Sequence, residues 1–304
     1  MSALSHRTRQ TPHSTVDQCY LWGLASTDTR KSFHATIEQT RQTAKSQSSL
    51  RRSIHRWVFA DTSLAVTAAL LAGVWLAVAH AWLALTVTIL WAWFIDWIFV
   101  VHTTVVRGPD SVIKDRFGLP NGLTTLRLML TPVVALYLSR PNAWGRAALP
   151  ALLIVLGVGL TDVLDGNLAR LLHMKTDFGR DMDPMTDIVM TSASALSLGW
   201  ARIIPWWLAA LVAFRYLGAL AGFILISGYR RLVPVGSTMI GKVCTPAVQL
   251  TFFALVLSKI RPNLALSTHW LNGLKTGIAI LVAINIVLLA AFGLRTKRRM
   301  APRR

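Results

Sequence analysis

Eight long apolar stretches divide most of this chain, and each is close to the length that an α-helix needs to cross a lipid bilayer. A bilayer core offers the backbone no hydrogen-bond partners, so a spanning segment satisfies its own N–H and C=O groups as a helix of roughly 20 residues. The stretches therefore predict an all-α integral membrane protein. They fall at residues 57–79, 81–105, 121–139, 147–172, 182–201, 205–228, 240–258 and 273–294.

Composition supports this membrane setting. Of the 304 residues, 53% are hydrophobic and 15% are charged, and the mean hydropathy is +0.48. The net charge of +19 raises the question of nucleic acid, but the basic residues collect at the ends of apolar segments. That distribution favours contact with anionic lipid headgroups, so we expect no nucleic-acid partner. With only Cys19 and Cys244 present, neither a disulfide framework nor a thiolate metal site is indicated.

Charged and polar segments set the expected domain boundaries. Residues 1–56 lack an apolar core and predict a basic, disordered cytoplasmic tail; an organelle-targeting presequence stays open, since the segment is rich in Arg and Ser and poor in acids. Residues 57–106 predict a two-helix N-terminal membrane appendage. The charged break at 107–120, expected as a short amphipathic element on the membrane surface, begins a six-helix unit at 107–295. Residues 296–304 form a basic C-terminal tail.

The charges flanking the stretches also predict an orientation. If the N-terminus is cytoplasmic and the helices alternate, most basic residues near the helix ends face the cytoplasm, as the positive-inside rule requires. We therefore expect a bacterial-type cytoplasmic membrane with both chain ends inside. The basic residues placed inside are Arg51, Arg52, Arg56, Arg107, Lys114, Arg116, Lys175, Arg180, Arg230, Arg231, Lys242, Arg295, Lys297, Arg298 and Arg299.

Four carboxylates interrupt the fourth and fifth stretches at regular spacing. A carboxylate inside a bilayer is costly unless it is paired or binds a cation. Asp162 and Asp165 share one helix face, and Asp183 and Asp187 lie one turn apart on the next helix. Oxygen ligands at this density suit Mg²⁺, Mn²⁺ or Ca²⁺ rather than zinc, and two such ions are needed to offset four charges. A two-metal site is typical of phosphoryl transfer, and we expect it at the cytoplasmic face.

Small residues and an arginine lie among these carboxylates. Gly166 and Ala169 leave room for a ligand to lie against the helix, and Arg170 offers a bidentate fork to phosphate. The combination predicts a pocket for a metal-bound diphosphate.

The full spacing, D-x2-D-G-x2-A-R-x8-G-x3-D-x3-D, resembles the signature of the CDP-alcohol phosphotransferase family. All eight defining positions are matched, from Asp162 to Asp187 and including Gly179. Residues 120–127 (Pro-Asn-Gly-Leu-Thr-Thr-Leu-Arg) are similar to the family's opening of its first helix. Gly241-Lys242 is similar to another recurring element, although Cys244 stands where a second Lys is expected. The resemblance covers about residues 111–295.

The resemblance implies a six-helix bundle, here preceded by two additional transmembrane helices, that usually forms a homodimer. It implies transfer of a phosphatidyl group from a CDP-linked lipid, CDP-diacylglycerol, to an alcohol with release of CMP, using two divalent cations, Mg²⁺ or Mn²⁺. Asp187 would be the catalytic base and a further metal ligand. The other implied site residues are Asp162, Asp165 and Asp183 for the metals and Gly166, Ala169, Arg170 and Gly179 for the CDP moiety.

The alcohol is less constrained by the sequence. An arginine inside a membrane helix is a candidate functional residue, so Arg215 is a possible ligand for an acceptor phosphate. The form Asp183-Pro-Met-Thr-Asp187 resembles branches that form glycerophosphate lipids or cardiolipin, which favours glycerol 3-phosphate. Tyr216 argues mildly against this, because an acidic residue is expected there. Inositol phosphate, phosphatidylglycerol, serine and choline or ethanolamine acceptors stay open.

Two readings from other classes remain. The carboxylates could form the ion path of a cation-binding or transport protein, or the chain could be a catalytically silent relative that binds membrane partners. Outside the motif, Asp61 and Asp96 are expected at helix ends or facing the bundle. The tryptophans at 91, 93 and 97 predict an interfacial belt.

Overall fold

A computed structural model describes residues 48–75, 81–101, 106, 114–143, 167–168, 171–172, 174–229, 239–260 and 267–300. Within these ranges, all regular secondary structure is helical, as predicted. The longer helices in these ranges are α2 (Ser48–Trp75), α3 (Ala81–Val101), α4 (Leu119–Met129), α5 (Thr131–Leu138), α7 (Asp177–Trp200), α8 (Trp206–Tyr229), α9 (Met239–Ile260) and α10 (Thr268–Met300), and Pro141–Ala143 forms a 3₁₀ turn.

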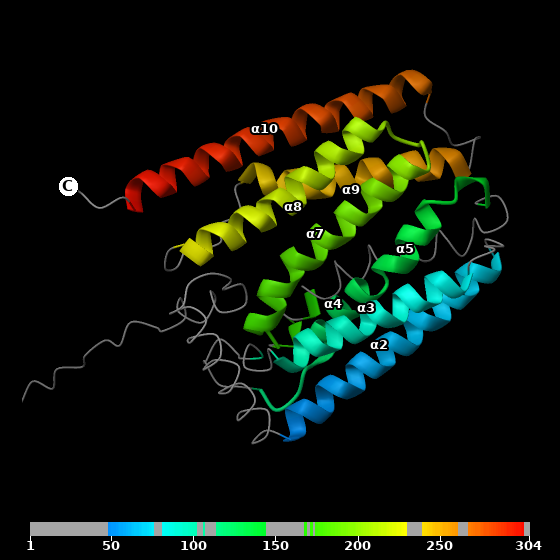
Figure 1. Cartoon of the computed structure of the whole chain (residues 1–304), viewed down its shortest axis with the longest axis vertical. Helices are drawn as coiled ribbons and strands as arrows, with labels where there is room; N and C mark the ends of the chain where they lie inside the picture. Colours follow the sequence, from blue (N-terminus) through cyan, green and yellow to red (C-terminus); the bar gives the residue numbers. More distant parts are fainter. Residues whose placement is uncertain are drawn as a thin grey trace, which may run out of the picture.

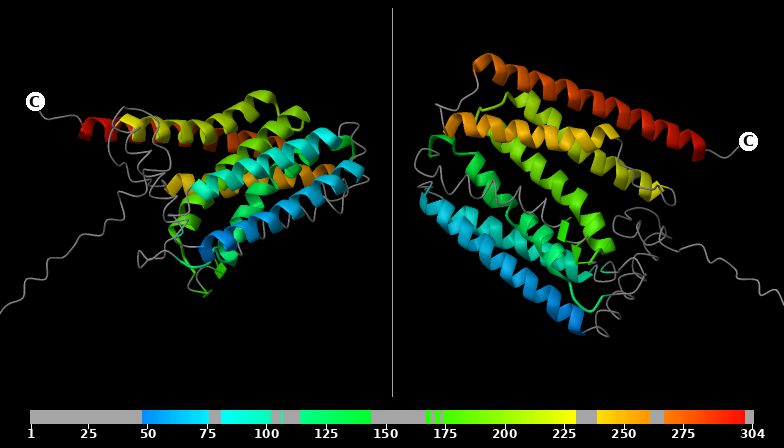
Figure 2. Two further views of the ribbon diagram at one scale, coloured as in Figure 1. Left: turned by 60° about the horizontal axis from the view of Figure 1, so that its bottom comes forward. Right: turned by 180° about the vertical axis from the view of Figure 1, so that it is seen from behind.

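The helices lie alongside one another as a bundle. Figure 1 shows α2 and α3 on one side, α4, α5 and α7 in the middle, and α8, α9 and α10 on the other side, and the two views of Figure 2 agree. Three spans in the described residues are long and apolar enough to cross a membrane: Ser48–Val74, Val243–Ile260 and Thr268–Ala291. These findings support a helical membrane protein. The expected stretch at 147–172 falls largely outside the described residues.

Helix α2 begins earlier than its apolar stretch. It starts at Ser48, so residues 48–56, which the sequence analysis placed in the tail, are helical. Leu50 and Ile54 explain the extension, since both are buried against the bundle while Arg51 and Arg52 on the opposite side are exposed. The polar first turns therefore belong to an amphipathic helix end, whose apolar face is too short to register as a membrane stretch.

The third apolar stretch is two helices rather than one. Helix α4 ends at Met129 and α5 begins at Thr131, with Leu130 between them in right-handed helical geometry (φ −76°, ψ −10°). Pro132 accounts for the break, because proline has no N–H to donate to the carbonyl of Leu128 and its ring crowds the preceding turn. Before α4, residues 114–118 are not helical, and Gly118 has a left-handed φ of 83°.

The carbonyl of Leu128 receives a hydrogen bond from α3. The indole Nε1 of Trp91 donates to it at 2.9 Å, so this tryptophan, predicted as part of an interfacial belt, makes a specific contact between two helices. Trp93, two positions along α3, is 70% exposed and faces outward. Residues two positions apart on a helix point to nearly opposite sides. Trp91 therefore faces α4, whereas Trp93 faces away from the bundle.

Helix α7 joins two apolar clusters of the core. Its first half contributes Phe178 and Met182 to a cluster shared with α2, α3 and α4. Its second half contributes Met190 and Leu198 to a larger cluster shared with α5, α8, α9 and α10. Asp183 and Asp187 lie along α7 between these two regions of the core.

The acids of the N-terminal helices are also accounted for. Asp61 is buried within α2, as expected for a bundle-facing residue. Asp96 of α3 lies 3.6 Å from the Nδ1 atom of His55 on α2. Both acids therefore belong to the packing of α2 against its neighbours.

Candidate active site

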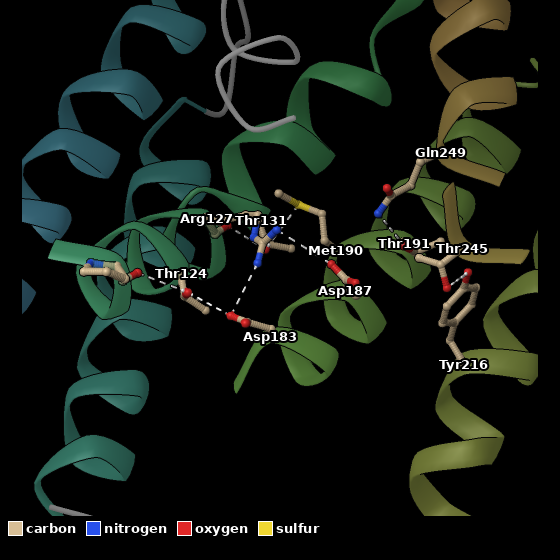
Figure 3. A network of polar contacts seen from close by, with 11 residues as sticks. Thr124, Arg127, Thr131, Asp183, Asp187, Met190, Thr191, Tyr216, Thr245 and Gln249 are labelled. Carbon is tan, nitrogen blue, oxygen red and sulfur yellow. Dashed lines mark hydrogen bonds and ion pairs between the residues drawn. The ribbon is translucent and has the colours of Figure 1, made fainter. Parts of the chain in front are cut away.

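Two aspartates of α7 face one arginine of α4. Asp183 and Asp187 lie one helical turn apart, as predicted, so both side chains project from the same side of α7. An Oδ1–guanidinium distance of 3.9 Å joins Asp183 to Arg127, and one of 3.8 Å joins Asp187 to the other terminal nitrogen of the same guanidinium. Figure 3 shows Arg127 between the two carboxylates. A single cation thus bridges both acids.

A threonine of α4 completes the contact on Asp183. The Thr124 hydroxyl donates to Asp183 Oδ1 at 2.9 Å, the same oxygen that faces Arg127. Thr124 lies three residues before Arg127, so the two side chains point from adjacent turns of one face of α4. Together they fix the rotamer of Asp183 from two directions (Figure 3).

A second polar contact between α4 and α7 lies one turn nearer their N-termini. Thr176 caps α7: its Oγ1 accepts from the Gly179 N–H at 3.1 Å, and its hydroxyl donates to Asn121 Oδ1 at 2.8 Å. A Cβ on Gly179 would come within 3.1 Å of the same Asn121 oxygen. Gly179 therefore allows the close approach of the two helices, in addition to its expected role at the CDP moiety.

Burial differs sharply across this cluster. The Arg127 side chain is 3% exposed, whereas those of Asp183 and Asp187 are 44% and 33% exposed. The cation is thus held inside the protein while both carboxylates keep oxygens accessible. Accessible carboxylates anchored from behind can bind a cationic ligand or accept a proton without rearrangement of the helices.

The two carboxylates fit part of a divalent-cation site. They supply hard oxygen ligands, the type that Mg²⁺ and Mn²⁺ prefer. In the described ranges no group of three or more His, Cys, Asp or Glu side chains gathers as a metal site. Asp162 and Asp165, the expected further ligands, lie outside those ranges, as do Gly166, Ala169 and Arg170.

Arg215 lies on α8, in a different setting. Its Nε donates to Asn285 Oδ1 on α10 at 2.9 Å, and its guanidinium carbon lies 3.9 Å from the ring centroid of Tyr216. The Tyr216 hydroxyl donates to Thr245 on α9 at 3.0 Å. Arg215 is half-buried, and its contacts with Asn285 and Tyr216 orient the guanidinium.

Thr124 and Arg127 have no role predicted from the sequence. Both lie in the segment 120–127 that resembled the family's first helix, but spacing alone did not join that segment to α7. The rule that an arginine within an apolar stretch is a functional candidate selected Arg215 and applies equally to Arg127.

Comparison with known sequences gives an independent view of the same region. The model of the CDP-alcohol phosphatidyltransferase family matches residues 117–292, from the start of α4 into α10. A Bacillus subtilis protein named CDP-diacylglycerol–glycerol-3-phosphate 3-phosphatidyltransferase is 28% identical over 47% of this chain and 79% of its own length. A Pectobacterium atrosepticum protein of the same name is 36% identical over 46% of this chain and 78% of its own length.

A second group of relatives carries another name. A putative cardiolipin synthase of Mycobacterium tuberculosis is 30% identical over 47% of this chain and 66% of its own length. No solved structure matches this chain. The family match covers more than half of the chain and includes the positions of Asp162 and Asp165, the pair Asp183 and Asp187, and the α4 residues Thr124 and Arg127 that contact this pair. This chain belongs to the CDP-alcohol phosphatidyltransferase family.

Proposed function

We propose that this protein transfers the phosphatidyl group of CDP-diacylglycerol to glycerol 3-phosphate and releases CMP. The observation that carries the proposal is the pair Asp183 and Asp187, one turn apart, partly exposed and anchored by the buried Arg127. The pair lies within the region that matches the family. The relatives described above are named as phosphatidyltransferases and synthases, which favours an enzyme over a cation transporter or a silent relative.

In the proposed reaction, the acceptor hydroxyl oxygen bonds to the phosphorus that carries the diacylglycerol. The bond from that phosphorus to the bridging oxygen of the diphosphate breaks, and CMP leaves with that oxygen. Asp187 accepts the proton of the attacking hydroxyl; its carboxylate is accessible, and Arg127 holds it from behind. Catalysis comes largely from positioning and from neutralising charge.

Two divalent cations, Mg²⁺ or Mn²⁺, belong to the proposal. Asp162, Asp165, Asp183 and Asp187 would hold them, and the bound ions would offset negative charge on the diphosphate. Gly166, Ala169, Arg170 and Gly179 would hold the CDP moiety. Arg127 and Thr124 act through Asp183 and Asp187: they fix the two carboxylates on the side turned away from the substrate.

Arg215 is proposed to bind the phosphate of the acceptor. Asn285 and the ring of Tyr216 hold its guanidinium without neutralising it, which leaves a directed cation inside the bundle. The fork of an arginine matches two phosphate oxygens. Because other relatives are named cardiolipin synthases, phosphatidylglycerol is the second candidate acceptor; its headgroup also carries a phosphate.

The remaining expectations complete the proposal. The catalytic unit is a six-helix bundle at 107–295 that forms a homodimer, with α2 and α3 as an addition before it. The tails at 1–56 and 296–304 contact anionic headgroups, although the first nine residues of α2 already lie within the former range. The site faces the cytoplasm.

An acceptor panel tests the proposed function. Purified protein in lipid nanodiscs receives CDP-diacylglycerol, Mg²⁺ or Mn²⁺, and one alcohol at a time, and CMP and the product lipid are measured. Glycerol 3-phosphate should give equimolar CMP and phosphatidylglycerophosphate, and chelation of the metal should stop the reaction. If only phosphatidylglycerol reacts and cardiolipin forms, phosphatidylglycerol is the acceptor in place of glycerol 3-phosphate. If no alcohol leads to release of CMP, the proposed enzymatic function is refuted.

A further inference from the structure

Helices α2 and α3, here called the α2–α3 pair, contact α4 along its whole length. Two residues before α4, the Phe117 N–H donates to Ser53 Oγ on α2 at 3.1 Å. In its first turn, Gly122 faces the ring of Trp57 so closely that a Cβ there would come within 2.4 Å of it. At its end, Trp91 of α3 donates to the Leu128 carbonyl. The α2–α3 pair precedes residue 117, where the family match begins.

The contact at Leu128 compensates for a proline. In a continuous helix the N–H of residue 132 would donate to this carbonyl, but Pro132 has none. A carbonyl left without a donor in an apolar environment is costly, and more so within a bilayer, where no water replaces the donor. The Trp91 indole supplies the missing N–H from a neighbouring helix. This is a specific polar contact, not general apolar packing.

The Leu128 carbonyl is next in the chain to Arg127, the arginine that faces Asp183 and Asp187. Leu128 follows Arg127 directly, and the Thr131 hydroxyl donates to the Arg127 carbonyl at 3.4 Å. Two successive backbone carbonyls at Arg127 and Leu128 thus accept side-chain hydrogen bonds, from Thr131 and Trp91 respectively. Arg127 in turn lies 3.8 and 3.9 Å from the two carboxylates of α7. A shift at the end of α4 would move the guanidinium relative to both acids.

We infer that the α2–α3 pair is an internal brace for the catalytic centre, and that Trp91 is its principal positioning residue, acting through Leu128 on Arg127. This inference rests on the proposed function, since turnover is one of its readouts. It assigns the N-terminal helices a task in the reaction of the family region, rather than one of anchoring alone.

The test compares four variants with the wild type in nanodiscs. Trp91→Phe removes the indole N–H. Trp93→Phe is the matched control, the same change on the outward face of α3, where the side chain is 70% exposed. Pro132→Ala restores an N–H at residue 132, and the helical geometry of Leu130 points that N–H toward the Leu128 carbonyl. The double variant Trp91→Phe/Pro132→Ala therefore has a donor for the carbonyl without Trp91.

Trp91→Phe should lower kcat about tenfold, as loss of a group that orients a catalytic residue does. The KM for CDP-diacylglycerol should change less than about twofold, because the end of α4 lies two turns from Asn121 and Gly179. Trp93→Phe should match the wild type. The kcat of the double variant should lie within about threefold of the kcat of Pro132→Ala alone. Equal kcat for Trp91→Phe and Trp93→Phe would overturn the inference, as would a loss that Pro132→Ala does not reduce.

Hydrogen–deuterium exchange over residues 119–129 provides a readout without turnover. Exchange there should be faster in Trp91→Phe than in Trp93→Phe, and unchanged exchange would refute the brace even if the wild type released no CMP. A wild type without CMP release but with this difference would refute the proposed function and keep the brace. If Trp91→Phe does not fold, the double variant decides: recovery of folded protein supports the inference, and failure of both variants contradicts it.

Discussion

Arg127 and Arg215 both lie within apolar parts of the bundle helices, and their surroundings are opposite. Arg127 on α4 is 3% exposed and faces two carboxylates of α7. Arg215 on α8 is half-buried, bonded through Nε to the neutral amide of Asn285 and stacked on Tyr216. In the part of the chain that the structure describes, no carboxylate pairs with Arg215. The charge of Arg127 is thus offset by two acids, whereas the neutral partners of Arg215 orient its guanidinium and leave its charge available.

The difference separates two tasks that residue type alone does not distinguish. A buried cation that faces two acids fixes those acids and has little capacity left for a ligand. A cation held by an amide and an aromatic ring keeps its charge for an incoming anion. Arg127 is therefore expected to act on the rate of the reaction, and Arg215 on the binding of a phosphorylated acceptor.

The largest effect is expected at the carboxylates that Arg127 holds. Asp183→Asn keeps the size of the side chain but removes its charge, so turnover should fall by about 10³-fold or more, as for loss of a group worth several kcal/mol in the transition state. Steady-state CMP release measures it. Asp177→Asn in the first turn of the same helix is the control and should keep most activity; a similar loss there would show that any acid of α7 matters equally.

Substitution of Arg127 itself should come next. Arg127→Lys keeps the charge but loses the planar fork that spans both carboxylates, and kcat should fall by about 10²-fold with a smaller change in KM. Rates at saturating CDP-diacylglycerol and acceptor give kcat directly. A rise in the acceptor KM with unchanged kcat would reverse the roles of the two arginines.

Arg215→Gln should affect the acceptor instead. Removing a phosphate-binding fork should raise the KM for glycerol 3-phosphate about tenfold or more, while the KM for CDP-diacylglycerol stays close to the wild-type value. Initial rates over a range of each substrate separate the two constants. An acceptor KM that does not change would remove Arg215 from the site and leave it as a link between α8 and α10.

The smallest effect is expected at Thr124. Thr124→Val removes the hydroxyl that donates to Asp183 and should lower kcat by about three- to tenfold, which corresponds to the roughly 0.5–1.5 kcal/mol of a typical hydrogen bond, because Asp183 is 44% exposed to solvent. Thr125→Val is the matched control, because its buried hydroxyl donates to the Asn121 carbonyl within the same helix. Equal losses in both variants would mean that packing of α4, rather than the contact to Asp183, sets the rate.

The sequence predicted the helical class well, because a bilayer leaves the backbone few alternatives. It also predicted that Asp183 and Asp187 share one side of a helix, since that follows from the helical period. The break between α4 and α5 was missed. A single proline within an apolar stretch can kink a helix or end it, and the neighbours decide which.

The contacts between helices were beyond the sequence. Arg127 and Asp183 are 56 positions apart, and no periodicity within either helix reports which faces meet. Trp91 shows the same limit: its place in a tryptophan cluster predicted a membrane interface, and the sequence does not show that its indole donates to the Leu128 carbonyl, which Pro132 leaves without its usual N–H donor. Family resemblance brought residues 120–127 to notice, and the structure shows what two of them contact.

The central claim is that the cluster between α4 and α7 transfers a phosphatidyl group. CDP-diacylglycerol labelled with ³²P at the phosphate next to the lipid tests it most directly, with the wild type and Asp183→Asn side by side. The wild type should place all the label in the product lipid and release unlabelled CMP in equal amount, and Asp183→Asn should do neither. Label in a water-soluble nucleotide, or equal transfer by both proteins, would contradict the claim.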